Sequence, residues 1–199
     1  MRRPRKGKAK LKTTEKVLII CEGETEQCYI NQLLRDFNLT TANITVDHVG
    51  GGGYTNIRHY IERNRALYSI ILVVCDLSRA AHKMTEKQRL KSLIRLIEDE
   101  NLKNNIFLNS PEIEVWIAAC VGADPRELQG LGYEKGNTVG RFLREYKGNY
   151  WQACKYFEHA SMYFEKRDFR RGTYNEESLS TPHSNLVYFI EYMKALIRI

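Results

Sequence analysis

Acidic residues stand directly after the apolar stretches of this chain, where a parallel sheet would bring them together. Glu22 follows the run VLIIC, and Asp76 follows ILVVC. Glu112 and Glu114 come just after IFLNSP. Because the carboxyl ends of parallel strands open onto one edge of a sheet, we expect these carboxylates to meet there. Oxygen-rich clusters of this kind bind Mg²⁺ or Mn²⁺ and leave positions open for a phosphate, so they indicate metal-dependent phosphodiester chemistry.

Each acid also has a structural interpretation, and the sequence leaves both readings open. Glu24 and Glu26 fall at the start of an expected helix, where a carboxylate is stabilised by up to ~1 kcal/mol without any metal. Asp76 can cap the following loop, and Glu114 can be a solvated helix residue. Glu22 is the hardest to explain structurally, because it lies at the strand tip before the helix begins.

The elements that must position these acids alternate between strands and helices. Apolar runs predict strands at 16–21, 43–49, 69–75 and 104–109. Helical spacing predicts helices at 26–37, 54–67, 85–101 and 111–122, the first capped by Thr25 and the last opened by Pro111. This order, with strands that are continuous apolar runs, predicts an α/β fold with a mostly parallel sheet and helices on both faces. Segments 138–166 and 182–199 are expected to be C-terminal helices packed on that sheet.

The N-terminus is a basic arm, MRRPRKGKAKLK, with seven Lys or Arg residues and no acid, so it accounts for the whole net charge of +7. Residues 1–14 are therefore expected to be disordered and attracted to polyanions, with a solubilising tail as the alternative. Residues 15–199 are expected to form one domain. A second basic cluster, EKRDFRRGTY, suits a nucleic-acid backbone or, alternatively, a solvated loop. The predicted nucleic-acid contacts are Arg2, Arg3, Arg5, Lys6, Lys8, Lys10, Arg167, Arg170 and Arg171.

Composition excludes several classes of protein. The longest apolar run, YSIILVVC, is far shorter than the ~18 residues of a membrane span, so no membrane association is expected. Five cysteines without a C-x-x-C pair favour reduced thiols and a cytoplasmic location over zinc binding or disulfides. The chain has no P-loop, and its glycine run VGGGGYTN lacks the dinucleotide-binding spacing, so an ATPase or a dinucleotide enzyme is not expected.

Two further features have a functional and a structural interpretation. The glycine run lies between an expected strand and an expected helix, so it is either a phosphate cradle or a flexible turn. His82, six residues after Asp76, is either a general acid near a leaving oxygen or an exposed histidine in a polar loop.

Three motifs, taken together, resemble a known family. VLIICEGETEQCYI resembles the opening motif of Toprim domains, and more closely that of the RloB-like family, which is related to OLD-family nucleases. NSPEIEVWIAACVG and STPHSNLVYFIEYM are similar to later segments of the same family, in the same order. The resemblance implies a Toprim or Rossmann-like fold that binds divalent metal and hydrolyses phosphodiester bonds in RNA or DNA. It also implies a role in bacterial antiphage defence, including abortive infection.

By position in these motifs, the resemblance implies roles for individual residues. Glu22, Asp76 and Glu114 would be catalytic and hold Mg²⁺ or Mn²⁺, and Glu26 would be a further metal ligand. Lys135, in GYEKGN, is a weaker match to a lysine that would lie against the scissile phosphate.

One residue departs from the family pattern. Where the family has Asp-x-Asp, this chain has Asp76-Leu77-Ser78, so Ser78 offers a neutral oxygen and would hold a cation less tightly or through water. The sequence therefore predicts a metal-dependent endonuclease, with a catalytically degenerate nucleic-acid-binding or regulatory subunit as the alternative. An ATPase or restriction-system partner protein and a homo-oligomer are compatible with either.

Overall fold

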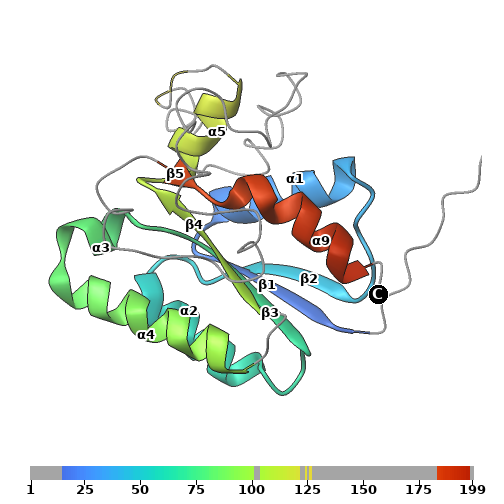
Figure 1. Ribbon diagram of the computed structural model, residues 1–199, viewed down its shortest axis with the longest axis horizontal. Coiled ribbons are helices and arrows are strands. Elements are labelled where there is room, and N and C mark those ends of the chain that lie inside the picture. The colour runs from blue at the N-terminus through green and yellow to red at the C-terminus, as the bar shows by residue number, and fades with distance from the viewer. Residues whose placement is uncertain (1–14, 101–103, 122–123, 125, 127–182, 198–199) are drawn as a thin grey trace, which may run out of the picture.

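The computed structural model describes residues 15–100, 104–121, 124, 126 and 183–197. Its centre is a five-stranded sheet in the order β2-β1-β3-β4-β5 (Figure 1). Four strands are parallel: β1 (Val17–Cys21), β2 (Ile44–His48), β3 (Ile70–Asp76) and β4 (Asn105–Ser110). The short β5 (His183–Ser184) pairs with β4 in the antiparallel direction. The predicted α/β fold with a mostly parallel sheet is confirmed.

Helices follow the strands in the predicted order. The bounds are α1 (Glu24–Asp36), α2 (Gly53–Asn64), α3 (Ser78–His82), α4 (Met84–Glu100), α5 (Ile113–Val121), the 3₁₀ helix η4 (Leu186–Tyr188) and α9 (Phe189–Ile197). None of the helices in the described ranges is long and apolar enough to span a membrane.

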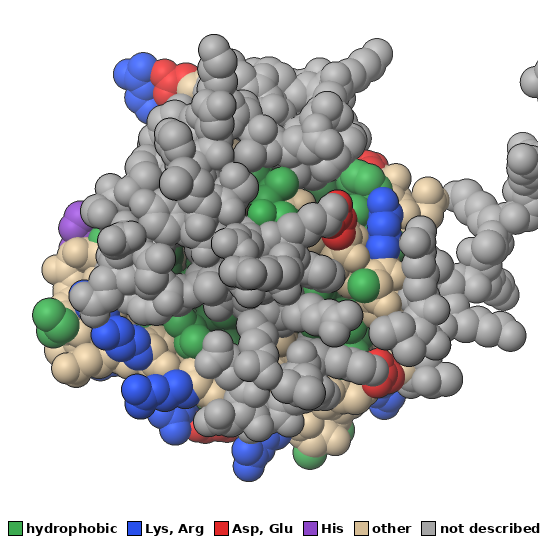
Figure 2. Space-filling view, in the orientation of Figure 1, with side chains coloured by type: hydrophobic (Ala, Val, Ile, Leu, Met, Phe, Trp, Pro, Cys, Tyr) green, Lys and Arg blue, Asp and Glu red, His purple; other side chains and the backbone are tan. Residues whose placement is uncertain are grey.

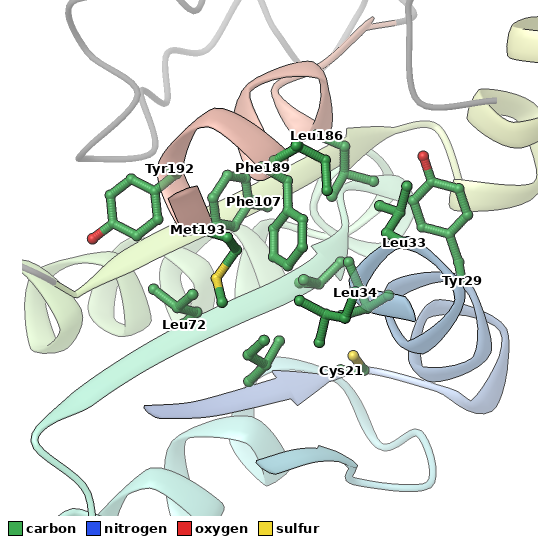
Figure 3. Close-up of a cluster of buried hydrophobic side chains, with 14 of the residues drawn as sticks. Cys21, Tyr29, Leu33, Leu34, Leu72, Phe107, Leu186, Phe189, Tyr192 and Met193 are labelled. Carbon is green, nitrogen blue, oxygen red and sulfur yellow. The ribbon is translucent and has the colours of Figure 1, made fainter. Parts of the chain in front are cut away.

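The sheet has a hydrophobic core on each face, because successive side chains of a strand point to opposite sides. Helices α1, α5 and α9 cover one face, where Val17, Ile19 and Cys21 of β1 point. In that core the Phe107 ring meets the Phe189 ring edge-on, with centroids 5.2 Å apart (Figure 3). Helices α2, α3 and α4 cover the other face. Helices on both faces, as predicted, bury the sheet completely in its centre.

Four local predictions were wrong. Gly23, not Thr25, precedes the first turn of α1, because the Glu26 side chain accepts a hydrogen bond from the Gly23 N–H (3.1 Å). Pro111 lies outside α5, since its carbonyl accepts a hydrogen bond from the Ser78 N–H (3.2 Å).

The other two errors are elements that the sequence did not indicate. The loop expected after Asp76 contains the short helix α3, which buries Ala80 against the sheet. The C-terminal helix was expected from Pro182, but β5 and η4 precede α9. Two strand residues are too few to show any periodicity, so their pairing with β4 depends on tertiary contacts.

The strand order creates a crevice at one point of the sheet. From β1 the chain passes to β2 on one side and then to β3 on the other. Ligands of open α/β sheets bind at such a reversal, beyond the carboxyl ends of the two central strands. Glu22 directly follows β1, and Asp76 is the last residue of β3, so both acids lie at this reversal.

Several predictions fall on residues outside the described part of the chain. They concern the basic arm (residues 1–14), Lys135, the helix expected at 138–166 and the cluster with Arg167, Arg170 and Arg171. They stay predictions.

Candidate functional site

A polar pocket of about 310 Å³ lies at the carboxyl ends of β1 and β3. The residues around it are Glu22, Gly23, Glu26, Gly51, Asp76, Ser78, Arg79, Glu112 and Glu114. We call it the acidic pocket. The acids come from three separate segments of the chain, and the sheet brings them together as their positions after the strands predicted. Their chemical roles stay predictions.

Glu22 is held in the pocket by hydrogen bonds with β3 and an ion pair with α3. Its N–H donates to the Val74 carbonyl (3.0 Å), and its Oε2 accepts from the Asp76 N–H (3.2 Å). Its Oε1 pairs with the Arg79 guanidinium (3.2 Å). Burial nevertheless raises the pKa of Glu22, since the Asp76 hydrogen bond and Arg79 offset the desolvation only in part.

Glu26 is the most deeply buried acid of the pocket, with 4% of its surface exposed. Its Oε2 accepts the Gly23 N–H, which fixes the carboxylate at the first turn of α1. Burial raises the pKa of Glu26 to about 8, and the charges of Glu114 and Glu22 contribute to the rise. An ordinary capping carboxylate has its pKa lowered by the helix terminus, so the capping role alone does not explain Glu26.

Asp76 is held in place by hydrogen bonds from β4 and from α2. Its Oδ1 accepts from Asn109 Nδ2 (3.1 Å), and its main-chain carbonyl accepts from the Tyr54 hydroxyl (2.7 Å). Burial raises the pKa of Asp76 well above its usual range, and Glu26, Glu22 and Glu114 raise it further. The negative charges of the pocket therefore destabilise one another, which a bound cation would relieve.

Two hydrogen bonds join the strands and helices that carry the pocket residues. The Leu77 N–H donates to the Asn109 carbonyl (2.7 Å), which joins the exits of β3 and β4. The buried Trp116 Nε1 donates to the Tyr29 hydroxyl (3.0 Å), which joins α5 to α1. Because Glu114 is on α5 and Glu26 is on α1, this second bond links the two helices that carry these acids.

The glycine run lies beside the pocket, and Gly51 lines it. Gly50 to Gly53 all have positive φ, a conformation that favours glycine. The Gly51 N–H donates to the Glu22 carbonyl (3.0 Å), and Asn56 Nδ2 donates to the Gly51 carbonyl (3.0 Å). A Cβ on Gly52 would lie 1.9 Å from Asn56 Nδ2, so a side chain there would displace Asn56. The run is thus a fixed turn beside the pocket, and its phosphate-binding role stays a prediction.

Sequence reasoning missed Arg79 and assigned the positive charge of the site to Lys135. Arg79 lines the acidic pocket from α3 and pairs with Glu22. Its only sequence signal is that it is the first basic residue after the strand that ends at Asp76. His82 is exposed and does not line the pocket, which favours the surface interpretation of this histidine.

The donor chemistry of the pocket fits Mg²⁺ or Mn²⁺. The side chains offer carboxylate oxygens and the Ser78 hydroxyl, with no nitrogen or sulfur ligand among the pocket residues. Within the described residues, no three or more His, Cys, Asp or Glu side chains are arranged around one metal position. Glu22, Asp76 and Glu114 would hold such a cation, whose charge would offset the repulsion between the carboxylates.

Comparisons of the chain with protein-family models, curated proteins and solved structures found no match. The RloB-like resemblance therefore rests on the motifs alone.

Proposed function

We propose that the protein is a divalent-metal-dependent nuclease that hydrolyses phosphodiester bonds of RNA or DNA, in the cytoplasm, as part of a bacterial antiphage defence system. The observation that carries the proposal is the acidic pocket, in which Glu22, Glu26, Asp76 and Glu114 share one hollow at the strand reversal. The RloB-like motifs, with their Toprim fold, supply the reaction class and the biological setting.

In this proposal Glu22, Asp76 and Glu114 hold the cation, with Glu26 and Ser78 beside them. A bound Mg²⁺ or Mn²⁺ supplies Lewis acidity, which polarises a phosphoryl oxygen and lowers the pKa of a coordinated water. Because burial raises the pKa of Glu26 to about 8, this carboxyl holds a proton at neutral pH, and cation binding would favour its release. Asn109 keeps the Asp76 carboxylate in place through the 3.1 Å hydrogen bond to Oδ1.

Among the residues that the structure describes, Arg79 is the group best suited to receive the substrate phosphate. Its guanidinium is half-exposed and lies at the edge of the pocket, where Glu22 holds it. A guanidinium presents paired N–H donors that match two oxygens of a phosphate and stabilise the charge that grows in the transition state. The glycine turn beside it has no side chains, so a nucleotide backbone can approach closely.

The test is a nuclease assay with Mg²⁺ or Mn²⁺ on tRNA, single strands and duplexes. Glu22→Gln removes a charge from the pocket and should abolish cleavage. Glu24→Gln is the matched control, because Glu24 lies in the same first turn of α1 but does not line the pocket. Cleavage that survives Glu22→Gln unaltered contradicts the assigned site.

The second candidate is a Toprim-derived subunit that binds nucleic acid or a partner protein without turnover. Ser78 favours it, because this residue offers no charge where the family pattern has an acid. Tight binding without cleavage of any substrate, alone or with an ATPase or restriction-system partner, would establish this function instead.

A further inference from the structure

A second hollow, of about 450 Å³, lies between α2 and α4 on the face of the sheet opposite α1 and α5. The residues around it are Tyr54, Thr55, Arg58, His59, Glu62, Thr85, Gln88, Arg89 and Ser92. We call it the α2–α4 groove. None of these residues belongs to the acidic pocket, so the nuclease proposal does not account for the groove.

The segment that builds this face is strongly basic. Residues 53–97 contain nine Lys or Arg and three Asp or Glu, a net of six positive charges, although the body of the chain is neutral overall. Residues 17–36, with β1 and α1, contain four acids and one base. Figure 2 shows blue Lys and Arg side chains at the lower left of the view, over α4. Charge is thus segregated between the two faces of one sheet.

The arginines of the groove are held in place yet remain accessible. Arg58 pairs with Glu62 (2.9 Å), and their side chains are 50% and 40% exposed. Arg89 pairs with Glu86, whose side chain is 12% exposed, while that of Arg89 is 54% exposed. The exposed Arg58–Glu62 pair contributes only about 0–1 kcal/mol, so a phosphate can replace or share its carboxylate at little cost. Arg89 remains paired with the buried Glu86 and can meet a phosphate only through its exposed half.

Donors recur along the groove rather than converge on one point. Thr85, Arg89 and Ser92 lie on successive turns of α4, so their spacing along the helix is close to the 5.4 Å pitch. A single small anion would use one such donor group. A repeated anion, as in a sugar–phosphate backbone, uses all of them in turn.

The groove and the acidic pocket adjoin at the start of α2. Tyr54 lines the groove, and its hydroxyl donates to the carbonyl of Asp76 in the pocket (2.7 Å). At Gly53 a Cβ would lie 3.3 Å from Arg79 Cδ and 3.3 Å from Glu86 Oε2, so the arginine of the pocket and the carboxylate that pairs with Arg89 both lie close to Gly53. The groove therefore lies near the acids at the start of α2.

We infer that the α2–α4 groove binds the sugar–phosphate backbone of a nucleic acid and guides it to the acidic pocket. This inference deepens the proposed nuclease function and rests on it. The groove supplies phosphate contacts, which give affinity without sequence selection.

The test measures binding of the full chain to a fluorescein-labelled oligothymidylate of about 20 nucleotides by anisotropy, in EDTA and over a range of salt. Arg58→Glu should weaken binding roughly tenfold and lower the salt slope by about 0.7 to 1. Arg35→Glu is the matched control, because Arg35 is also an exposed helical arginine, in the last turn of α1 on the other face. It should leave the affinity and the salt slope close to those of the wild type.

Ser92→Glu is a second variant, which adds a negative charge to the opposite wall without breaking any ion pair of the groove. It should weaken binding several-fold. If both groove variants bind like Arg35→Glu, the groove inference is wrong. If polyglutamate competes as well as the oligonucleotide at equal charge, the groove is an acidic-peptide surface, which also overturns it.

Because the assay contains no divalent metal, its outcome is separate from that of the nuclease assay. A protein that binds through the groove and cuts no substrate retains the groove inference and loses the nuclease proposal. One that cuts while Arg58→Glu and Ser92→Glu behave as the control loses only the groove inference.

Discussion

The acidic pocket and the α2–α4 groove adjoin but hold their charges in opposite ways. In the pocket, Glu22 and Glu26 are 8% and 4% exposed and lie among further carboxylates. In the groove, the Arg58 and Arg89 side chains are about half-exposed and each has an acidic partner. The pocket gathers buried negative groups, whereas the groove carries solvent-exposed positive groups that are spaced along two helices.

This difference indicates a division of labour. Burying like charges is costly, and a fold retains them where something else, such as a cation, compensates them. Exposed arginines cost little and are screened by salt, so they suit long-range attraction and sequence-independent affinity. We therefore assign the chemistry to the pocket and the affinity to the groove and the basic arm. Each prediction below tests one side of this division.

The largest effect is expected from Asp76→Asn, which keeps the size of the side chain and removes its charge. Cleavage should fall by more than about 100-fold, because loss of even an outer partner of a metal ligand costs about 10- to 100-fold. Asp47→Asn is the control, since Asp47 lies on the neighbouring strand β2 but outside the pocket. Equal cleavage rates for the two variants in the same Mg²⁺ assay would contradict the assignment of chemistry to the pocket.

Deletion of residues 1–12 should have the next largest effect, on affinity rather than on catalysis. The deletion removes seven positive charges, so oligonucleotide binding should weaken by at least about tenfold at low salt and its salt dependence should flatten. The measurement is the anisotropy titration at several salt concentrations. Equal salt slopes before and after the deletion would show that the arm makes no phosphate contact.

The stability of the metal-free protein should fall as pH rises. The pKa of Glu26 is about 8 in the folded chain against an ordinary 4.5, so the folded state keeps a proton that the unfolded state has lost. Glu26 therefore makes its full contribution to the free energy of unfolding below about pH 4.5, and this contribution is lost as the pH rises to about 8. The raised pKa values of Glu22 and Asp76 act in the same direction.

Melting temperatures in EDTA between about pH 5 and about pH 8 measure this dependence. Glu26→Gln should flatten the decline, because glutamine keeps an acceptor for the Gly23 N–H and has no proton to lose. Glu24→Gln should leave the slope as in the wild type. A melting temperature that is constant, or that rises with pH, would mean that burial and the neighbouring charges do not raise the pKa values of the pocket carboxyls in the free protein.

The smallest effect is expected from Trp116→Phe, which removes the buried bond from Nε1 to the Tyr29 hydroxyl. The free energy of unfolding should fall by about 1–3 kcal/mol, since the tyrosine hydroxyl is left without this donor. Because the bond joins α5 to α1, metal affinity should also fall, while oligonucleotide binding in EDTA should not change. Chemical denaturation and the anisotropy assay measure the two effects, and a loss of binding in EDTA would place α5 on the nucleic-acid surface.

The sequence predicted the sheet and the meeting of the acids because both follow from strong local patterns. Val17–Cys21 and Ile70–Cys75 are continuous apolar runs of strand length, which are typical of strands buried on both faces. Once such strands are parallel, Glu22 and Asp76 must lie at the same edge. No finer knowledge of contacts is needed for that conclusion.

The features that the sequence did not reveal depend on contacts between distant segments. The position of Ser78 and the start of α3 are set by hydrogen bonds from Leu77 and Ser78 to the carbonyls of Asn109 and Pro111, about 30 residues away. Arg79 reaches Glu22 only because α3 forms there. The groove was not predicted either, because its lining is assembled from two helices whose exposed faces look like ordinary solvated surfaces in sequence.

The central claim is that the acidic pocket binds a divalent ion, and Mn²⁺ titration followed by electron paramagnetic resonance of the free ion tests it most directly. The wild type should show saturable binding, and the Glu22→Gln, Asp76→Asn double variant should bind at least about tenfold more weakly while its circular dichroism spectrum is unchanged. Saturable binding of equal strength in both proteins, or none in the wild type, would contradict the claim.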